Sequence, residues 1–435
     1  MIIYQILPRL WGYSRMSSVD DCSLEYFRSL GVTHVWYTGL IRHSTGKPFV
    51  KGDPGSPYAI SDYFDINPYL ADNPKDRISE FEKLVKRTHD HGLKVIMDFV
   101  PNHIGLDYAD SEGGIPHFDW HDYDWSDTRK IDYSHPGTWE TMYRIVRFWA
   151  GKGVDGFRCD MAELVTSEFF RWLISRIKGE FPDVIFIAEV YQKERYREYS
   201  EHAGFDYLYD KSGLYDTLRS VVGGRTSVKS VTWNWQQLGD LQPKMLNFLE
   251  NHDEQRIASP WFAGRKDCFA CIGPSALFNT APFMLYFGQE IGIDASEGHE
   301  GRTSIFSWNR PEALMRLYSY IHGHGNLTEE ETMVLDKYRN LLGIAAENVV
   351  TKGLTYDLCY CQNASGGFDQ DKHFAFIRHN GIDTLLVVSN FSMKDCNLEI
   401  TIPEYAFSYL GLDRKRIHEK VVLQVKALDT LVAKL

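Results

Sequence analysis

The sequence has no apolar run approaching the ~20 residues that a membrane-spanning helix requires. Its N-terminus also lacks a basic segment followed by an apolar one, because Met1 leads directly into the strand-like sequence from Ile2 to Leu7. These absences predict a protein that does not cross a membrane. We expect a cytoplasmic location, although a signal peptide that had been removed would leave no trace.

The sequence contains few cysteines and fewer basic than acidic residues. Seven cysteines form no framework typical of a small disulfide-rich domain, and the close pairs Cys268/Cys271 and Cys359/Cys361 lack the further ligands of a zinc site. Lys plus Arg number 47 against 59 Asp plus Glu, a net charge of −12 with no basic run. We therefore expect reduced cysteines and neither a nucleic-acid nor an anionic-membrane partner. The composition does not predict the oligomeric state.

What the sequence does contain is a regular alternation of apolar strands and amphipathic helices, with carboxylates at strand ends. Asp160, Glu189 and Asp253 each follow an apolar strand, and their separations of 29 and 64 residues fit one and two strand–helix units of about 30 residues. Parallel strands that end in functional side chains are typical of a (β/α)8 TIM barrel. Eight strands are expected, at 2–7, 32–37, 94–98, 156–160, 185–189, 205–209, 245–250 and 281–287.

Three segments depart from this alternation. A long loop is expected over 39–73, and a polar, aromatic excursion follows the third strand over 104–136. From about Val350, short β-branched runs separated by turns such as Asn380-Gly381 predict an antiparallel C-terminal β-domain. We thus expect a barrel from 1–103 and 137–349, a short inserted domain at 104–136, and a β-sandwich at 350–435.

Four short motifs follow one another along the chain: Asp98-Phe-Val-Pro-Asn-His103, Gly156-Phe-Arg-Cys-Asp160, Ala188-Glu189-Val190 and Glu250-Asn-His-Asp253. Further short segments of interest are Tyr4–Pro8, Pro57–Tyr63 and Pro282–Glu290. In this order, the four motifs are similar to the signature regions of the α-amylase family, glycoside hydrolase family 13, and the further segments support the resemblance. The resemblance covers about residues 1–345.

The resemblance implies a role for each of three carboxylates: Asp160 as nucleophile, Glu189 as general acid/base and Asp253 as transition-state stabiliser. Retaining glycosidases need two carboxyl groups about 5 to 5.5 Å apart, which adjacent strands can provide. Arg158, on the same strand face as Asp160, is expected to lower the pKa of Asp160, and the apolar strand before Glu189 is expected to raise the pKa of Glu189.

The same resemblance implies residues that contact the sugar. His103 and His252 would donate to hydroxyl groups, and Tyr58 would form a stacking platform, whereas the alternatives are a satisfied hydrogen-bonding histidine and a packing tyrosine. Asp98 is expected to orient its neighbours rather than touch the sugar. The loop 294–308, with Arg302 and Trp308, either helps to close the cleft or is an ordinary surface loop.

A structural calcium ion is a further implication of the family, although the chemistry itself requires no cofactor. Asn102 matches a family calcium ligand, and Asp119, Asp127 and Asp132 are available as further oxygen ligands without a basis for choosing among them.

The expected activity is hydrolysis of α-1,4 bonds in maltooligosaccharides or α-glucans through a covalent intermediate. Many family members carry a Lys-His pair where this chain has Glu163 and Leu164, which puts endo-cleavage of long starch in doubt. A transglycosylase or isomerase on the same triad is the alternative, because a sugar hydroxyl can intercept the intermediate. A non-catalytic carbohydrate-binding protein is a third possibility, but it would be expected to have lost some of these carboxylates.

Overall fold

The computed structural model describes residues 1–46, 51–109, 114–296 and 298–435. Short parts of the predicted loops at 39–73, 104–136 and 294–308 therefore lie outside the described residues.

Eight parallel strands close into a barrel, which confirms the predicted fold. Neighbouring strands pair in the order β1-β12-β11-β10-β9-β8-β5-β2, and β1 closes the ring on β2. The strands lie within the predicted segments, apart from one residue at the end of the third. Their bounds are β1 Ile2–Ile6, β2 His34–Tyr37, β5 Lys94–Phe99, β8 Gly156–Cys159, β9 Ile185–Ala188, β10 Tyr207–Tyr209, β11 Met245–Phe248 and β12 Phe283–Tyr286.

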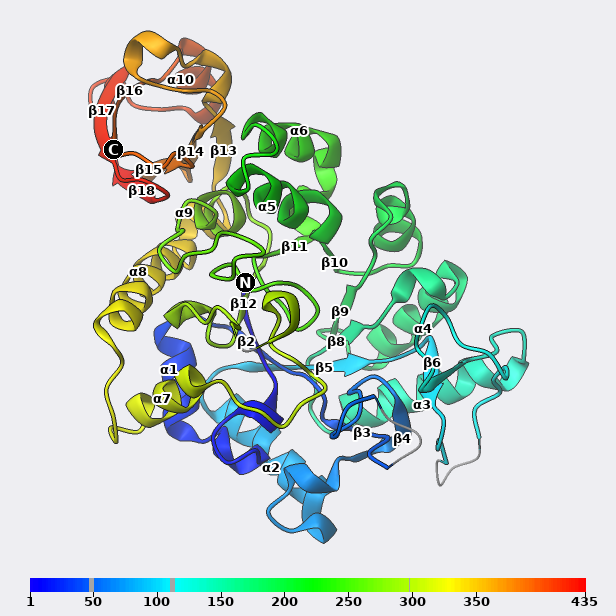
Figure 1. Ribbon diagram of the computed structural model, residues 1–435. Helices are drawn as coiled ribbons and strands as arrows, with labels where there is room; N and C mark the ends of the chain where they lie inside the picture. The colour runs from blue at the N-terminus through cyan, green and yellow to red at the C-terminus, as the bar shows by residue number, and fades with distance from the viewer. Residues whose placement is uncertain (47–50, 110–113, 297) are drawn as a thin grey trace.

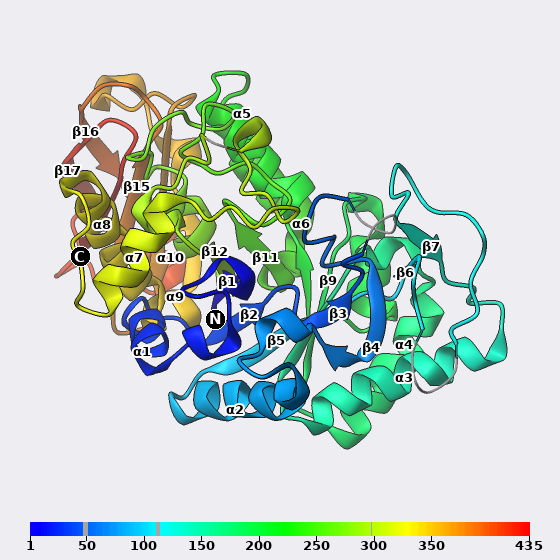
Figure 2. The same cartoon turned by 60° about the horizontal axis from the view of Figure 1, so that its bottom comes forward.

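Helices surround the barrel (Figures 1 and 2). In α2, buried Phe81, Leu84, Val85 and Thr88 recur at helical spacing, so one face packs on the barrel and the other meets water. α8 begins with a capping box between Thr328 and Glu331. The barrel helices are α1 Asp21–Ser29, α2 Arg77–Asp90, α3 Pro136–Gly151, α4 Ser167–Glu180, α5 Asp216–Val222, α6 Lys229–Leu238, α7 Glu312–Ile321, α8 Glu329–Ala345 and α9 Asn348–Thr351.

Two small hairpins extend from the barrel (Figure 2). The segment expected as an irregular loop at 39–73 instead contains antiparallel β3 (Ile41–His43) and β4 (Ile60–Ile66), because the alternating apolar residues of β4 bury one face. The excursion after β5 holds β6 (His103–Gly105) paired with β7 (Thr128–Lys130).

The C-terminal part is antiparallel, as predicted. A four-stranded sheet contains β13 (Leu354–Asp357), β14 (His373–His379), β15 (Thr384–Asn390) and β18 (Thr430–Lys434). A two-stranded sheet contains β16 (Cys396–Thr401) and β17 (Lys420–Val425), and α10 spans Glu404–Leu410. These elements lie at the opposite side of the barrel from the excursion (Figure 1).

Alternate side chains of β14 point to opposite faces of the four-stranded sheet, so this strand contributes to two separate hydrophobic cores. Phe374 and Phe376 of β14 belong to the barrel core, and their rings lie 4.9 Å from that of Phe278. Ala375 and Ile377 face a second core beneath the two-stranded sheet. The predicted domain boundaries at 103, 136 and 349 stay predictions.

The structure bears on two expectations from the sequence, the absence of a membrane-spanning helix and the reduced state of the cysteines. Within the described ranges, no helix combines the length and apolar character needed to cross a bilayer. All seven cysteines are free thiols.

Candidate active site

Three carboxylates meet at one end of the barrel. Asp160 directly follows β8, Glu189 directly follows β9, and Asp253 lies in the loop after β11. All three line a single cavity of about 500 Å³ at the carboxyl ends of the strands. Tyr58 and His103 line the same cavity. The structure therefore places the three carboxylates, Tyr58 and His103 around one cavity, whereas the predicted sugar contact His252 is fully buried beside Asp253.

Arg158 holds two of these carboxylates side by side. Its side chain is fully buried, and its Nη1 donates to Asp160 Oδ1 at 2.7 Å. Its Nη2 forms an ion pair with Glu189 Oε2 at 2.7 Å, at an angle unfavourable for a hydrogen bond. Since both nitrogens belong to one planar guanidinium, the spacing of the two carboxylates is fixed by covalent geometry.

Aromatic rings surround the guanidinium of Arg158. The carbon Cζ lies 5.5 Å from the ring centre of Trp36, 5.3 Å from that of Tyr58 and 5.4 Å from that of Tyr209. These ring faces stabilise the buried cation without neutralising it. Asp98 contributes a weaker contact at 3.4 Å and accepts a hydrogen bond from Trp36, and its orienting role stays a prediction.

The two carboxylates on Arg158 have raised pKa values. Burial raises the pKa of Glu189 to about 7, against the opposing effect of Arg158. Burial likewise raises the pKa of Asp160 to about 6. The expected lowering of the pKa of Asp160 by Arg158 is therefore wrong in net sign, because the loss of hydration outweighs the cation.

A strained residue connects the nucleophile strand to Glu189. Met161, directly after Asp160, has φ 42° and ψ 44°, a left-handed conformation that is unfavourable for a side chain. Its N–H donates to Glu189 Oε2 at 2.7 Å. This geometry places the backbone donor at the carboxylate, and strain of this kind is concentrated at functional sites.

Asp253 is paired with a histidine. Its Oδ2 lies 2.9 Å from Nε2 of His252, and its side chain is 40% exposed to the cavity. The pKa of Asp253 is lowered overall, because the charge and the hydrogen bond of His252 outweigh the opposing effect of burial. The ring of Tyr58 stacks on His252 at 5.2 Å, and Tyr58 Oη lies 2.5 Å from His252 Nε2.

His103 lies on the other side of the nucleophile. Its Nε2 is 4.0 Å from Asp160 Oδ2, and burial lowers the pKa of His103 to about 4. The ring is therefore neutral at physiological pH and has one N–H to donate, as contact with a sugar hydroxyl requires.

Two residues at the acid/base were missed by the sequence reasoning. Tyr191 Oη donates to Glu189 Oε1 at 2.5 Å, and the tyrosine lines the cavity. Glu163 Oε2 accepts from the backbone N–H groups of Tyr191 and Gln192 at 3.1 and 3.0 Å. The only available signal was Glu163 itself, which stands where many family members carry a Lys. Its buried carboxylate fixes the loop after β9.

The oxygen cluster at Asn102 already holds a cation. The ammonium group of Lys130 donates to Asn102 Oδ1, to Asp122 Oδ2 at 3.1 Å and to the carbonyl oxygen of Leu164 at 3.2 Å. Asn102 Nδ2 donates to the same oxygen of Asp122 at 2.8 Å. These residues do not fit a calcium ion as they stand, because a fixed positive charge occupies the centre of the oxygen set.

The predicted additional ligands are not part of that cluster. Asp127 lines the cavity instead, and Asp132 accepts hydrogen bonds from Ser134. The carboxylate that contacts Asn102 is that of Asp122, which was not among the predicted ligands.

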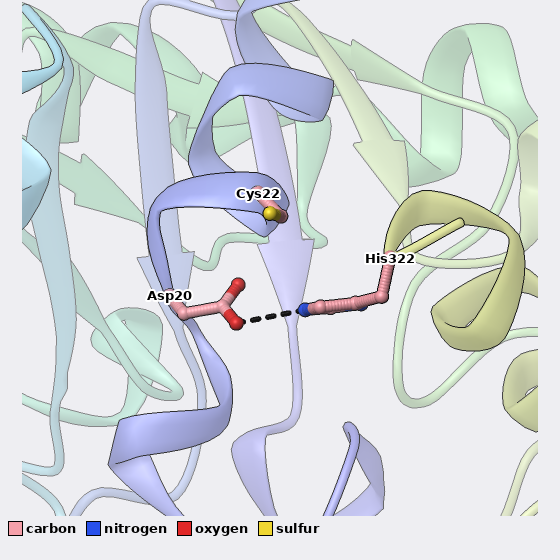
Figure 3. A group of neighbouring side chains, drawn as sticks. All are labelled: Asp20, Cys22 and His322. Carbon is pink, nitrogen blue, oxygen red and sulfur yellow. Dashed lines mark hydrogen bonds and ion pairs between the residues drawn. The ribbon is translucent and has the colours of Figure 1, made fainter. Parts of the chain in front are cut away.

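A different group has the composition of a metal site. Figure 3 shows Asp20, Cys22 and His322, whose ligand atoms lie within 4.8 Å of one another. Asp20 caps α1 by accepting from Ser23 N, and it pairs with His322 Nε2 at 2.7 Å. These contacts tie the start of α1 to the end of α7, and none of the three residues lines the cavity.

The loop after β12 reaches the cavity through residues other than those predicted. Ile305 and Phe306 line it, whereas Trp308 packs on Tyr69 with ring centres 5.0 Å apart. Arg302 is paired with Glu300 at 2.8 Å.

Comparison with known proteins connects this geometry to a family. The family model described as alpha amylase, catalytic domain, matches residues 21–140 and 120–340. Alpha-amylase 3 of Dictyoglomus thermophilum is 24% identical over 354 residues, covering 71% of this chain and 67% of that protein. An alpha-1,4-glucan:maltose-1-phosphate maltosyltransferase of Cereibacter sphaeroides is 28% identical over 247 residues, covering 47% and 39% respectively.

Solved structures share the fold along the whole chain. The crystal structure of a maltogenic alpha-amylase from Thermotoga neapolitana has a TM-score of 0.73 and 24% sequence identity, and covers 100% of this chain and 96% of that one. The two curated relatives are longer proteins, of which this chain spans 67% and 39%.

Proposed function

This chain belongs to the α-amylase family, and we propose that it cleaves α-1,4-glucosidic bonds of maltooligosaccharides or α-glucans with retention of configuration. The observation that carries the proposal is the Arg158 guanidinium with Asp160 on one nitrogen and Glu189 on the other. A retaining mechanism needs an ionised and a protonated carboxyl beside one anomeric carbon. Burial raises the pKa of Glu189 to about 7, which keeps a proton available near neutral pH, and the hydrogen bond from Arg158 favours the ionised form of Asp160.

In the first step, Asp160 attacks the anomeric carbon while Glu189 transfers its proton to the glycosidic oxygen. The bond between carbon and oxygen breaks, and the sugar remains attached to Asp160 as an ester. Asp253 stays ionised beside His252, and its carboxylate stabilises the positive charge that develops on the sugar ring.

In the second step, the ionised Glu189 takes a proton from water, which attacks the anomeric carbon and releases Asp160. Arg158 and the Met161 N–H both stabilise the ionised form of Glu189 at this stage. Neutral His103 and Tyr58, whose ring is stacked on the buried His252, line the same cavity and bind the hydroxyl groups and the face of the sugar.

Transfer to a sugar hydroxyl in place of water is the second candidate, since a maltosyltransferase is among the relatives. Incubation with maltoheptaose and chromatography of the products tests both. Products shorter than the substrate support hydrolysis, and longer ones support transfer. An absence of any product, with correctly folded protein, would contradict the proposal.

No step of this mechanism uses a metal ion. Lys130 supplies the positive charge between Asn102, Asp122 and Leu164, and we infer that it performs there the structural role of a bound cation.

A further inference from the structure

A second cavity of about 450 Å³ lies beside α6 and is separate from the catalytic one. One wall is formed by Trp233 and Gln237 of α6 and the other by the segment that follows β9. Among the residues that line this cavity are Lys193, Glu194, Tyr196, Arg197, Trp233 and Gln237.

One aromatic side chain at this cavity is open to solvent. Trp233 lies 62% exposed on α6. An exposed indole at the edge of a cavity provides a flat apolar surface, and the C–H face of a pyranose ring matches such a surface.

A buried hydroxyl group in the same cavity has no partner. Tyr196 is 2% exposed, and its Oη makes no hydrogen bond within the part of the chain that the structure describes. Buried hydroxyl groups nearly always have a partner, because an unsatisfied one costs free energy. Because this oxygen is buried as well as unpartnered, the side chain of Tyr196 must turn toward the cavity for a ligand hydroxyl to supply that hydrogen bond.

The charges of the cavity do not favour an ionic ligand. Arg197 pairs with Glu201 and Asp240 at 2.5 Å each, so its charge is already matched by carboxylates. Lys193 donates to Asn234 Oδ1 at 3.1 Å, and Glu194 adds the opposite charge on the same wall. An aromatic face with balanced polar groups is suited to a neutral polyhydroxylated ligand.

The position of the cavity links it to catalysis. Lys193 is only two residues after Tyr191, which lines the catalytic cavity, so their Cα atoms are at most about 7.6 Å apart. A linear sugar chain that leaves the catalytic cavity along the segment after β9 would arrive at Trp233.

From these observations we propose that the Trp233–Tyr196 cavity is an accessory binding site for an α-glucan chain. The proposal rests on the proposed function for the choice of glucan over other sugars. The site extends the substrate class to chains longer than those that fill the catalytic cavity, and it gives such chains a second point of attachment.

Affinity electrophoresis in gels containing soluble amylose tests the site, with Asp160→Asn as the non-cleaving parent. In that background, Trp233→Ala and Tyr196→Phe should each weaken the affinity for amylose at least threefold. Tyr405→Ala, which removes an exposed aromatic ring from α10, is the control and should not change it. Amylose affinity within twofold of the parent in both test variants would overturn the proposal.

Kinetics of the same substitutions in the active enzyme separate binding from a structural effect. Trp233→Ala should lower kcat/KM on amylose at least threefold and leave kcat/KM on maltotriose within twofold. An equal loss on both substrates would overturn the accessory site. If the enzyme without substitutions cleaves neither glucan but Trp233-dependent retardation persists, the proposed function fails and the accessory site stands.

Discussion

The hydroxyl of Tyr191 donates a hydrogen bond to Glu189 Oε1 at 2.5 Å, at the carboxylate oxygen that no other protein donor contacts among the described residues. The other oxygen of Glu189 is contacted by the Met161 N–H and by Arg158. The proton that cleavage requires must therefore be carried on the oxygen that faces Tyr191, so this tyrosine influences both protonation states of the acid/base.

Tyr191→Phe should shift the alkaline limb of the kcat/KM profile to higher pH. The tyrosine hydrogen bond favours the ionised carboxylate and lowers the pKa of Glu189, so its removal should raise that pKa above about 7. The pH dependence of kcat/KM on maltooligosaccharides measures the shift. Tyr207→Phe, outside the catalytic cavity, is the control, and an alkaline limb that stays in place or moves to lower pH would contradict the assignment.

Glu163→Ala should affect the same step indirectly. Without its carboxylate, the N–H groups of Tyr191 and Gln192 lose their acceptor, and the Tyr191 hydroxyl is held less firmly. We expect kcat to fall about tenfold with a smaller change in KM, and Glu163→Gln, which keeps one acceptor oxygen, to restore most of it. A merely destabilised enzyme would not recover in this way.

Asp160→Asn and Glu189→Gln should each lower turnover by at least about 10³-fold while folding stays cooperative. The two variants should differ on an α-glycosyl fluoride. Fluoride leaves without a proton, so Glu189→Gln should still form the glycosyl-enzyme in a burst, whereas Asp160→Asn should not. Activity within tenfold of the parent for either variant on maltoheptaose would remove the assigned roles.

Glu189→Gln should also change how stability depends on pH. The folded protein holds the pKa of Glu189 at about 7, above its ordinary value of 4.5. Between these two pH values the folded state therefore binds more protons than the unfolded state. As a result, this carboxyl makes the free energy of unfolding fall as the pH rises from 4.5 to 7. The amide does not titrate, so the variant should gain stability relative to the parent from pH 4.5 to 7. Urea unfolding at pH 5 and pH 8 measures this, and a constant difference would contradict the raised pKa.

The melting temperature of the parent should not change in excess chelator, because Lys130 occupies the oxygen cluster at Asn102. Lys130→Met should lower the free energy of unfolding by about 1–3 kcal/mol, since it leaves the half-buried Asp122 carboxylate without its cation. Lys86→Met, which breaks the exposed pair with Asp90, should cost less than about 1 kcal/mol. A melting temperature that falls with chelator would show that a metal binds after all.

The barrel and the positions of the carboxylates could be predicted because each depends on a short stretch of sequence. Each strand is a short apolar run, and Asp160 and Glu189 directly follow theirs, so the closure of the barrel places them together. The β3–β4 hairpin was missed because Gly and Pro residues in 39–73 conceal the alternating pattern of β4.

The environment of each group could not be predicted. The sign of the pKa shift at Asp160 depends on how far burial outweighs Arg158, which is a balance of two large opposing effects. Lys130, Asp122 and Tyr191 reach their partners only through the fold of two loops, and nothing near them in the sequence indicates those contacts.

The alternating faces of β14 have a consequence for any shortened form of this chain. Removing residues from His373 onward would take Phe374 and Phe376 out of the barrel core and uncover the side of Phe278 that they contact. The carbonyl oxygen of Phe278 would also lose the hydrogen bond that Arg378 donates at 2.9 Å. The shortened protein would then expose an apolar surface, and we expect it to self-associate through that surface.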